Sequence, residues 1–190
     1  MANQIFEGGI FSGTLHASFY DATTQTWGTE KEAGNATKFD IQSTSEAKEL
    51  ISRKKESYGQ VLKAVTLPGK TTITCDVNDP DVDVLRVAFY GTAESTGTDG
   101  HVITGGTQSA CRVRWRLDGQ NLATGDPVEV MVWDSQVAPN GAIDFLSDDW
   151  QSVALTITPT KPADKAGPYQ ITYRGDSGGS GGGGNDPINP

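Results

Sequence analysis

Apolar and polar residues alternate over most of the chain, in short segments separated by turn residues. Alternation with period two is the pattern of half-buried β-strands, and many short strands at regular spacing indicate a sandwich or barrel. The pattern predicts nine strands, at residues 14–20, 37–42, 60–67, 70–77, 109–117, 128–134, 144–149, 151–159 and 169–174. Nine strands in one domain predict two packed sheets or a closed barrel.

The stretch NDPDVDVLRVAFYG, residues 78–91, breaks this alternation. Asn78 or Asp79 can cap a helix, and Asp81 and Asp83 suit the positive end of its dipole. Apolar residues then recur at helical spacing and share one face: Val82, Leu85, Ala88 and Phe89. The stretch predicts one core-facing helix of about three turns that packs against a sheet.

Two polar segments are harder to assign. Residues 43–57 open with a capping-box pair, Ser43 and Glu46, but their apolar stripe is short, so a helix and an extended arm or hairpin both remain open. Residues 91–107 are polar and rich in glycine. They predict a long exposed loop, with a short strand at 101–104.

Composition and charge narrow the class of protein. The 190 residues suit one domain, which we place at 1–175, followed by a flexible Gly-rich C-terminal arm at 176–190. Asp and Glu outnumber Lys and Arg 24 to 15, and a net charge of -9 disfavours a nucleic-acid-binding protein. The start of the chain lacks the pattern of a secretory signal, and no run approaches the ~18 apolar residues of a membrane helix. We therefore expect folding in a cytoplasm, with no membrane partner.

No motif predicts catalysis, a cofactor or a metal. The two histidines, His16 and His101, lie outside any nucleophile motif, and GDSGGS at 175–180 belongs to a Gly/Ser linker. The aspartates near residue 80 lack the spacing of a calcium loop, and a helix start explains them. Cys75 and Cys111 lack CxxC spacing and are predicted to be small buried residues. The chain is therefore predicted not to be an enzyme.

Positive charge gathers at two places in this acidic chain. In CRVRWRLDG, strand alternation puts Arg112, Arg114 and Arg116 on one face and the apolar residues on the other. That face is either solvated or docks against acidic surface of another copy. The other place is SRKKESYGQVLKAV, residues 52–65, where Val61, Ala64 or Val65 is expected to pack inside.

The order of these pieces is similar to one known family. KELISRKKESYGQVLKAVTLPGKTTITCDVND, then PDVDVLRVAFYG and a Gly/Thr-rich loop, resembles the major tail proteins, or tail tube proteins, of long-tailed bacteriophages with non-contractile tails. The similarity covers residues 39–91 and continues more weakly through PVEVMVWDSQ. It implies a mainly β fold, a two-sheet β-sandwich or split barrel with one flanking α-helix.

The resemblance also implies a function and partners. Six copies form a ring, and rings stack into a hollow tube through which viral DNA passes without specific binding. The protein would lie in the virion tail, assembled in the host cytoplasm, beside the terminator, tape measure and distal tail proteins. A long loop and terminal arms connect the rings in this family. The candidates here are residues 43–57, 91–106, the first ten residues and the C-terminal tail.

Stacking copies of one acidic subunit requires positive surface opposite negative surface. We therefore predict contacts between copies from the basic stretch Arg53, Lys54 and Lys55 with Tyr58, and from the arginine stripe. Their predicted partners are acids of neighbours: Asp79, Asp81, Asp83, Asp148 and Asp149. A solvated basic turn remains the alternative for residues 53–55.

Two other functions stay open. The first is a monomeric β-sandwich binding module, of carbohydrate or adhesin type, in which tryptophans stack on sugars. Its candidate residues are Trp27, Trp115, Trp133 and Trp150. The second is another tail component of the same fold, a terminator or a baseplate hub protein.

Overall fold

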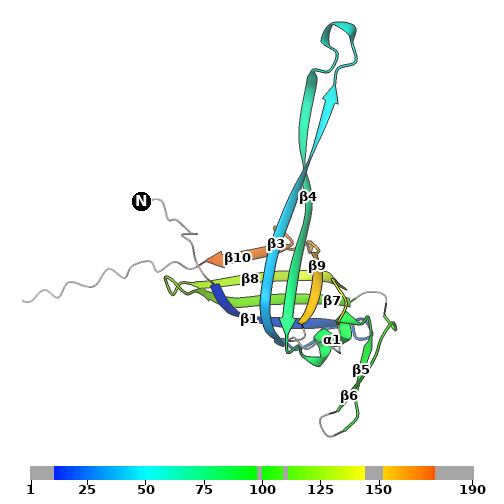
Figure 1. The fold of residues 1–190 in the computed structure, drawn as a ribbon, viewed down its shortest axis with the longest axis vertical. Helices are drawn as coiled ribbons and strands as arrows, with labels where there is room; N and C mark the ends of the chain where they lie inside the picture. Colours follow the sequence, from blue (N-terminus) through cyan, green and yellow to red (C-terminus); the bar gives the residue numbers. More distant parts are fainter. Residues whose placement is uncertain (1–10, 98–99, 109–110, 144–151, 174–190) are drawn as a thin grey trace, which may run out of the picture.

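The computed structural model describes residues 11–97, 100–108, 111–143 and 152–173 (Figure 1). These residues form antiparallel sheets and one α-helix, so the predicted mainly β fold with one helix is confirmed. The elements are β1 (Phe11–Asp21), β2 (Thr26–Trp27), β3 (Lys31–Ile51), the 3-10 turn η1 (Lys55–Ser57), β4 (Val61–Asn78), α1 (Val82–Ala88), β5 (Thr92–Ser95), β6 (His101–Thr104), β7 (Cys111–Asn121), β8 (Pro127–Pro139), β9 (Ser152–Pro159) and β10 (Tyr169–Tyr173).

Six strands pair around a closed path, in the order β8, β7, β1, β3, β4, β9 and back to β8. Strand β8 closes the ring because its two halves have different partners. Residues 128–132 pair with β10, and residues 135–139 pair with β9 (Figure 1). A closed ring leaves few free edges for unwanted pairing. Strand β10 is added outside this ring, against β8.

The core lies inside the ring and follows the alternation of the strands. On β7, Val113 and Trp115 are fully buried, while the three arginines that alternate with them are exposed or half-buried and face outward as predicted. Cys75 and Cys111 are buried free cysteines, which confirms that prediction. The remaining core side chains come from every strand of the ring and from α1, among them Leu15, Ala17, Ile73, Val77, Val84, Val87, Val132, Val137, Val153, Leu155 and Ile157.

Helix α1 forms where the sequence predicted a helix, but it is shorter, and its buried residues match the predicted face only in part. It has seven residues, and its N-cap is Asp81, whose carboxylate accepts a hydrogen bond from Asp83 N at 2.8 Å. The predicted caps Asn78 and Asp79 were wrong because β4 runs to Asn78 and Asp79 turns at φ 50°. Its buried residues are Val84, Val87 and Ala88, and Leu85 of the predicted face packs half-buried against the core.

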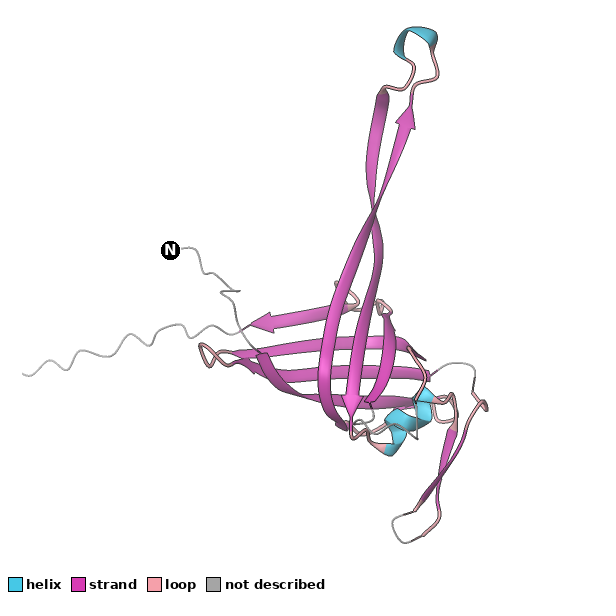
Figure 2. Cartoon of the chain, viewed as in Figure 1, coloured by secondary structure: helices cyan, strands magenta, loops and turns pink. Residues whose placement is uncertain are grey.

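The sequence left a helix and an extended arm or hairpin open for residues 43–57, and the structure has the extended hairpin. Strands β3 and β4 form one hairpin that runs far beyond the barrel, closed by η1 at its tip (Figure 2). The two predicted strands at 60–67 and 70–77 are therefore one strand, β4. Residues 91–107 hold the predicted strand at 101–104, paired with β5 as a short second hairpin.

Some predictions lie outside the described residues. They concern the strand at 144–149 with Asp148 and Asp149, the side chain of Trp150, the first ten residues and the tail at 176–190.

Candidate functional site

A β-bulge marks the base of the projecting hairpin. The register shifts between the pairs Ser43↔Thr71 and Ser45↔Pro68, so one strand carries an extra residue there. Gly69 makes this possible, since a Cβ at this position would lie 1.9 Å from the Thr44 carbonyl oxygen. A bulge bends a strand pair and changes its direction. We call residues 45–68, beyond this bulge, the arm.

The tip of the arm is a structured turn built around Ser52, the one buried residue in the described part of the arm. Ser52 N donates to the Gln60 carbonyl at 2.8 Å, and Gly59 N donates to the Ser52 carbonyl at 3.0 Å. The hydroxyls of Ser52 and Ser57 lie 2.7 Å apart. These bonds hold the tip in a defined shape, so it presents its outer side chains in fixed positions.

The predicted contact residues Arg53, Lys54, Lys55 and Tyr58 lie together on this tip. All four are exposed, Tyr58 to 78%. None of the three cations forms an ion pair with any residue that the structure describes. The whole arm holds five Lys or Arg residues and three Asp or Glu residues, so its formal charge is +2. The rest of the chain holds 10 Lys or Arg residues and 21 Asp or Glu residues, so its formal charge is -11. The arm is thus a basic extension of an acidic body.

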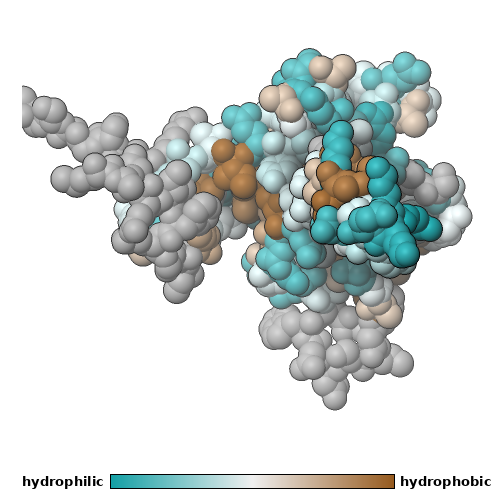
Figure 3. Space-filling view, turned by 90° about the horizontal axis from the view of Figure 1, so that it is seen from above, coloured by the Kyte–Doolittle hydropathy of each residue, from teal (hydrophilic) through white to brown (hydrophobic). Residues whose placement is uncertain are grey.

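Hydrophobic side chains lie exposed among hydrophilic ones in the view from above, which looks toward the arm (Figure 3). Six large apolar side chains there are more than 40% exposed: Leu50, Ile51, Tyr58, Val61, Leu62 and Val65. The prediction that Val61, Ala64 or Val65 packs inside is therefore wrong. Alternation showed that these residues form a strand, but not that this part of the strand leaves the barrel and pairs, among the described residues, only with β3.

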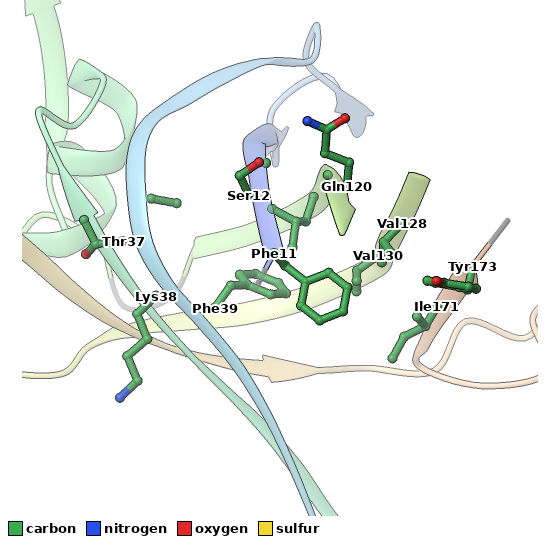
Figure 4. Close-up of a pocket in the computed structure, with 14 residues that line it drawn as sticks. Phe11, Ser12, Thr37, Lys38, Phe39, Gln120, Val128, Val130, Ile171 and Tyr173 are labelled. Carbon is green, nitrogen blue, oxygen red and sulfur yellow. The ribbon is translucent and has the colours of Figure 1, made fainter. Parts of the chain in front are cut away.

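A second apolar surface lies at the mouth of the barrel, where a groove of about 730 Å³ opens between β3 and β10 (Figure 4). Its floor contains the cross-strand pair Gly13↔Gly119, and a Cβ on either glycine would lie 2.7 Å from a carbonyl oxygen of the opposite strand. The two backbones therefore approach closely with no side chain between them. Its apolar lining comes from five strands: Phe11, Ala36, Phe39, Leu117, Val128, Val130, Ile171 and Tyr173.

Two arginines of the predicted stripe are held by carboxylates of their own chain. Arg112 contacts Asp134 at 2.5 Å, and Arg116 contacts Glu30 at 2.5 Å. The hydrogen bonds that Arg112 donates to Asp134 raise the pKa of Arg112, and those that Arg116 donates to Glu30 raise the pKa of Arg116. The same contact lowers the pKa of Glu30. The charges of both guanidiniums are therefore partly neutralised within a single chain.

Arg112 and Arg114 of the stripe also contact aromatic rings. The Arg112 guanidinium lies 4.2 Å from the centroid of Tyr20, and that of Arg114 lies 4.6 Å from Trp27. Arg114 Nε also donates to the Trp133 carbonyl at 3.2 Å. Cation–π contacts of this kind order long side chains on a surface. The face is an organised layer of arginine and aromatic side chains, and its contact with another copy stays a prediction.

The predicted acidic partners lie at the start of α1. Asp81 and Asp83 both contact the ammonium of Lys31, and Asp83 also accepts from Arg86 Nε at 3.0 Å. Burial raises the pKa of Asp83, but its bonds to Lys31 and the nearby Arg86 lower it more, so the net pKa is below its ordinary value. The partners of Asp81 and Asp83 are thus already in their own chain. Pairing of Asp79, Asp81 and Asp83 with a neighbour's arm stays a prediction.

The described residues were also compared with what a metal site, a reactive cysteine and a membrane-spanning helix require. Within the described residues, no three His, Cys, Asp or Glu side chains are placed to hold a metal ion. Burial raises the pKa of Cys75 to about 12 and also raises that of Cys111. No helix among the described residues is both long and apolar enough to cross a bilayer.

No protein-family model and no curated protein matches this chain.

Sequence reasoning located the basic tip but missed the groove. The groove residues come from five strands between Phe11 and Tyr173, and no local pattern joins them. The available signal was the spacing of Gly13 from Phe11 and of Gly119 from Leu117, because each glycine takes an inward position that a core side chain would otherwise fill.

Proposed function

We propose that the chain is a structural virion protein, a subunit that forms stacked hexameric rings and so builds the hollow tail tube of a long-tailed bacteriophage. In this proposal viral DNA passes through the tube, and the terminator, tape measure and distal tail proteins bind the tube ends. The observation that carries the proposal is the arm, with its six exposed apolar side chains and its exposed basic tip, whose cations pair with no carboxylate of the described residues.

An isolated two-stranded ribbon is marginally stable in water, because it buries little apolar surface. The arm is such a ribbon, and its residues 46–66, apart from Ser52 and Ser57, are exposed. Monomeric proteins rarely expose contiguous apolar patches of this kind without a partner. The arm therefore supports a protein whose burial is completed by other molecules, as in an assembly of many copies.

Charge supports assembly from identical copies. A basic arm of +2 attracts an acidic body of -11, so each copy carries both sides of an electrostatic contact. A hexameric ring has a formal charge of 6 × -9, or -54, which disfavours adhesion of DNA to an acidic wall. Screening limits this repulsion to about 8 Å at physiological salt, so it acts only on DNA close to the wall.

The position of the arm supports a polar assembly. The arm tip lies at one end of the long axis, and α1 lies on the opposite side of the barrel (Figure 1). A contact that joins the arm of one copy to a different surface of the next is heterologous, and such contacts form rings or open filaments. A tube of stacked rings combines the two: copies close into a ring, and rings stack into an open filament.

Electron microscopy of the purified full-length protein in negative stain tests the proposal. We expect hollow tubes or stacked rings at high protein concentration and low salt. Monodisperse monomers at high concentration, with affinity for a glycan, would show that the chain is a binding module instead.

A charge-reversal pair tests the role of the basic tip. Lys54→Glu and Lys161→Glu change the net charge equally, and both side chains are exposed. We expect Lys54→Glu to weaken assembly and reduce its salt dependence, while Lys161→Glu leaves both as in the wild type. Equal effects of the two variants would assign the result to net charge and not to the arm.

A further inference from the structure

We propose that residues 3–7, which precede β1, fold back along β1 as an added strand and cover the barrel-mouth groove of their own chain. The inference does not depend on the proposed function, because it concerns a contact within one subunit. It gives the first ten residues a role in their own barrel, whereas the family resemblance made them candidates for linking rings.

The groove opens where two neighbouring strands of the barrel separate. Strands β1 and β3 pair from Leu15↔Gly34 to Ala17↔Lys31. Before Leu15, residues 12–14 of β1 have strand partners only on β7, among the described residues, and residues 36–42 of β3 only on β4. Two backbone edges therefore border the groove without pairing with each other. An extended segment can add to such an edge through main-chain hydrogen bonds.

The floor of the groove is an apolar sheet face that no described element covers. It consists of residues two apart on β1, β7, β8 and β10, which share the inner face of these strands. Phe11 and Ile171 on this floor are still 42% and 48% exposed. Phe11 projects into the groove, whereas the ammonium of Lys38, the charged side chain of the lining, points away from it (Figure 4). The groove therefore requires an apolar cover.

The chain itself supplies two segments at this place. Its described part begins at Phe11 and ends at Tyr173, and both residues line the groove. Residues 174–190 contain no large apolar residue before Ile188. Residues 1–10 contain one charged residue, which is opposite in sign to Lys38, and three large apolar residues after Met1: Glu7, and Ile5, Phe6 and Ile10. Only the segment before β1 therefore has the composition that the groove requires.

A pair of glycines allows this segment to reverse its direction. Phe11 pairs with Asn121, the last residue of β7, so a segment that continued β1 in a straight line would leave the barrel. Gly8 and Gly9 precede this point, and Gly-Gly is favoured at the centre of a tight hairpin turn. A turn over residues 7–10 places Phe6 opposite Phe11.

This register decides which side chains enter the groove. Directly opposite residues of two antiparallel strands share a face, so Phe6 faces the groove beside Phe11, and Ile5 faces outward. Gly13 is then the diagonal neighbour of Phe6, within reach of an aromatic side chain. Gly13 and Gly119 leave space there, because neither has a side chain. The ring of Phe6 therefore packs over the glycine pair.

The short connection favours the chain's own segment over that of a second copy. Only four residues separate Phe6 from Phe11, so closing the hairpin costs little chain entropy. A short linker gives an effective concentration on the order of millimolar. At protein concentrations far below this value, the segment of a second copy does not compete.

A matched pair of full-length variants tests the cover. Phe6→Asp and Ile5→Asp make the same change at adjacent residues that face opposite sides of the added strand. We expect the amides of residues 12–14 that point away from β7 to exchange with deuterium at least about tenfold faster in Phe6→Asp than in the wild type, and within about twofold of the wild type in Ile5→Asp. Phe6→Ala, which adds no charge, should change exchange in the same direction as Phe6→Asp. Circular dichroism checks that all variants fold.

Binding of the apolar dye ANS shows whether the groove becomes open. We expect Phe6→Asp to bind more dye than the wild type or Ile5→Asp. A further change, Ile171→Asp, should remove this additional binding, because it places a charge on the groove floor.

Three outcomes would overturn the inference. Equal exchange and equal dye binding in all variants would show that the segment does not cover the groove. Equal effects of Ile5→Asp and Phe6→Asp would show that no defined face of the segment enters it. Wild-type protection that is lost on dilution would assign the cover to a second copy. A failure to form tubes would contradict the proposed function and leave the groove contact unchanged.

Discussion

Leu62 on the arm offers the sharpest measure of how much the arm contributes to association. Its side chain is 59% exposed, and its strand β4 pairs in the arm with β3. Full burial of a leucine side chain stabilises by ~1.5–3 kcal/mol. Docking can cover at most the exposed share, so the contact gains about 1–1.8 kcal/mol from Leu62.

Leu62→Ala removes most of this gain and leaves the monomer unchanged. One contact per subunit then converts to a rise of about 5- to 20-fold in the critical concentration for assembly. Sedimentation or light scattering over a concentration series measures this quantity. The midpoint of urea unfolding, measured below that concentration, should equal that of the wild type.

Leu122→Ala is the matched control, because Leu122 is 55% exposed but lies outside the arm and the groove. Equal critical concentrations for the two variants would refute the reasoning, since exposure alone and not the arm would then set the effect. A large loss of monomer stability in Leu62→Ala would also refute it, because that loss would place Leu62 in the core of its own fold.

Three further predictions concern the body of the protein. The buried Trp115 Nε1 has no hydrogen-bond partner among the described residues. Trp115→Phe should therefore lower the unfolding free energy by less than about 1.5 kcal/mol, because removal of this unsatisfied donor offsets the lost packing. Trp115→Ala should lower it by about 3–5 kcal/mol in the same urea titration. The folded pKa of Asp83 lies below its unfolded value, so its stabilisation is present above the unfolded pKa and is lost as the pH falls through the folded one. Stability should therefore drop from pH 7 to pH 3 by less in Asp83→Asn than in the wild type, and equal drops would contradict this assignment. Cys75 and Cys111 should react with a thiol reagent at pH 8 only after unfolding, because both are buried and Cys75 has a pKa of about 12; rapid reaction of the native protein would contradict this.

The sequence predicted local structure well wherever one face of an element is buried. On β7 the alternation of arginine with Val113 and Trp115 gave both the strand and its two faces. The helix was located to within a few residues, and its buried face in part, although its cap was not. The cap lies later than predicted because β4 runs to Asn78 and Asp81 N donates to the Ala33 carbonyl at 3.1 Å, so the helix begins only after that contact.

The arm shows where the local signal ends. Residues 43–51 contain helix-favouring residues, yet they are strand, because β3 pairs with β4 up to Ile51 near the tip of the hairpin. Residues 60–67 read correctly as a strand and wrongly as core. Period-two alternation records a ribbon with two faces, but it does not record whether another layer covers either face.

The sequence by itself therefore determined the mainly β class, the alternating faces of the strands, the buried cysteines and the clustering of basic residues at 53–55. Only the tertiary structure decided that this cluster ends a projecting arm, that the arginine stripe has partners in its own chain, and that Phe11 and Ile171 share a groove. The physical reason is the distance along the chain over which each interaction acts. Alternation and capping act over a few residues, whereas ring closure by β8 and β9 and the open barrel mouth depend on pairings between residues far apart in the chain.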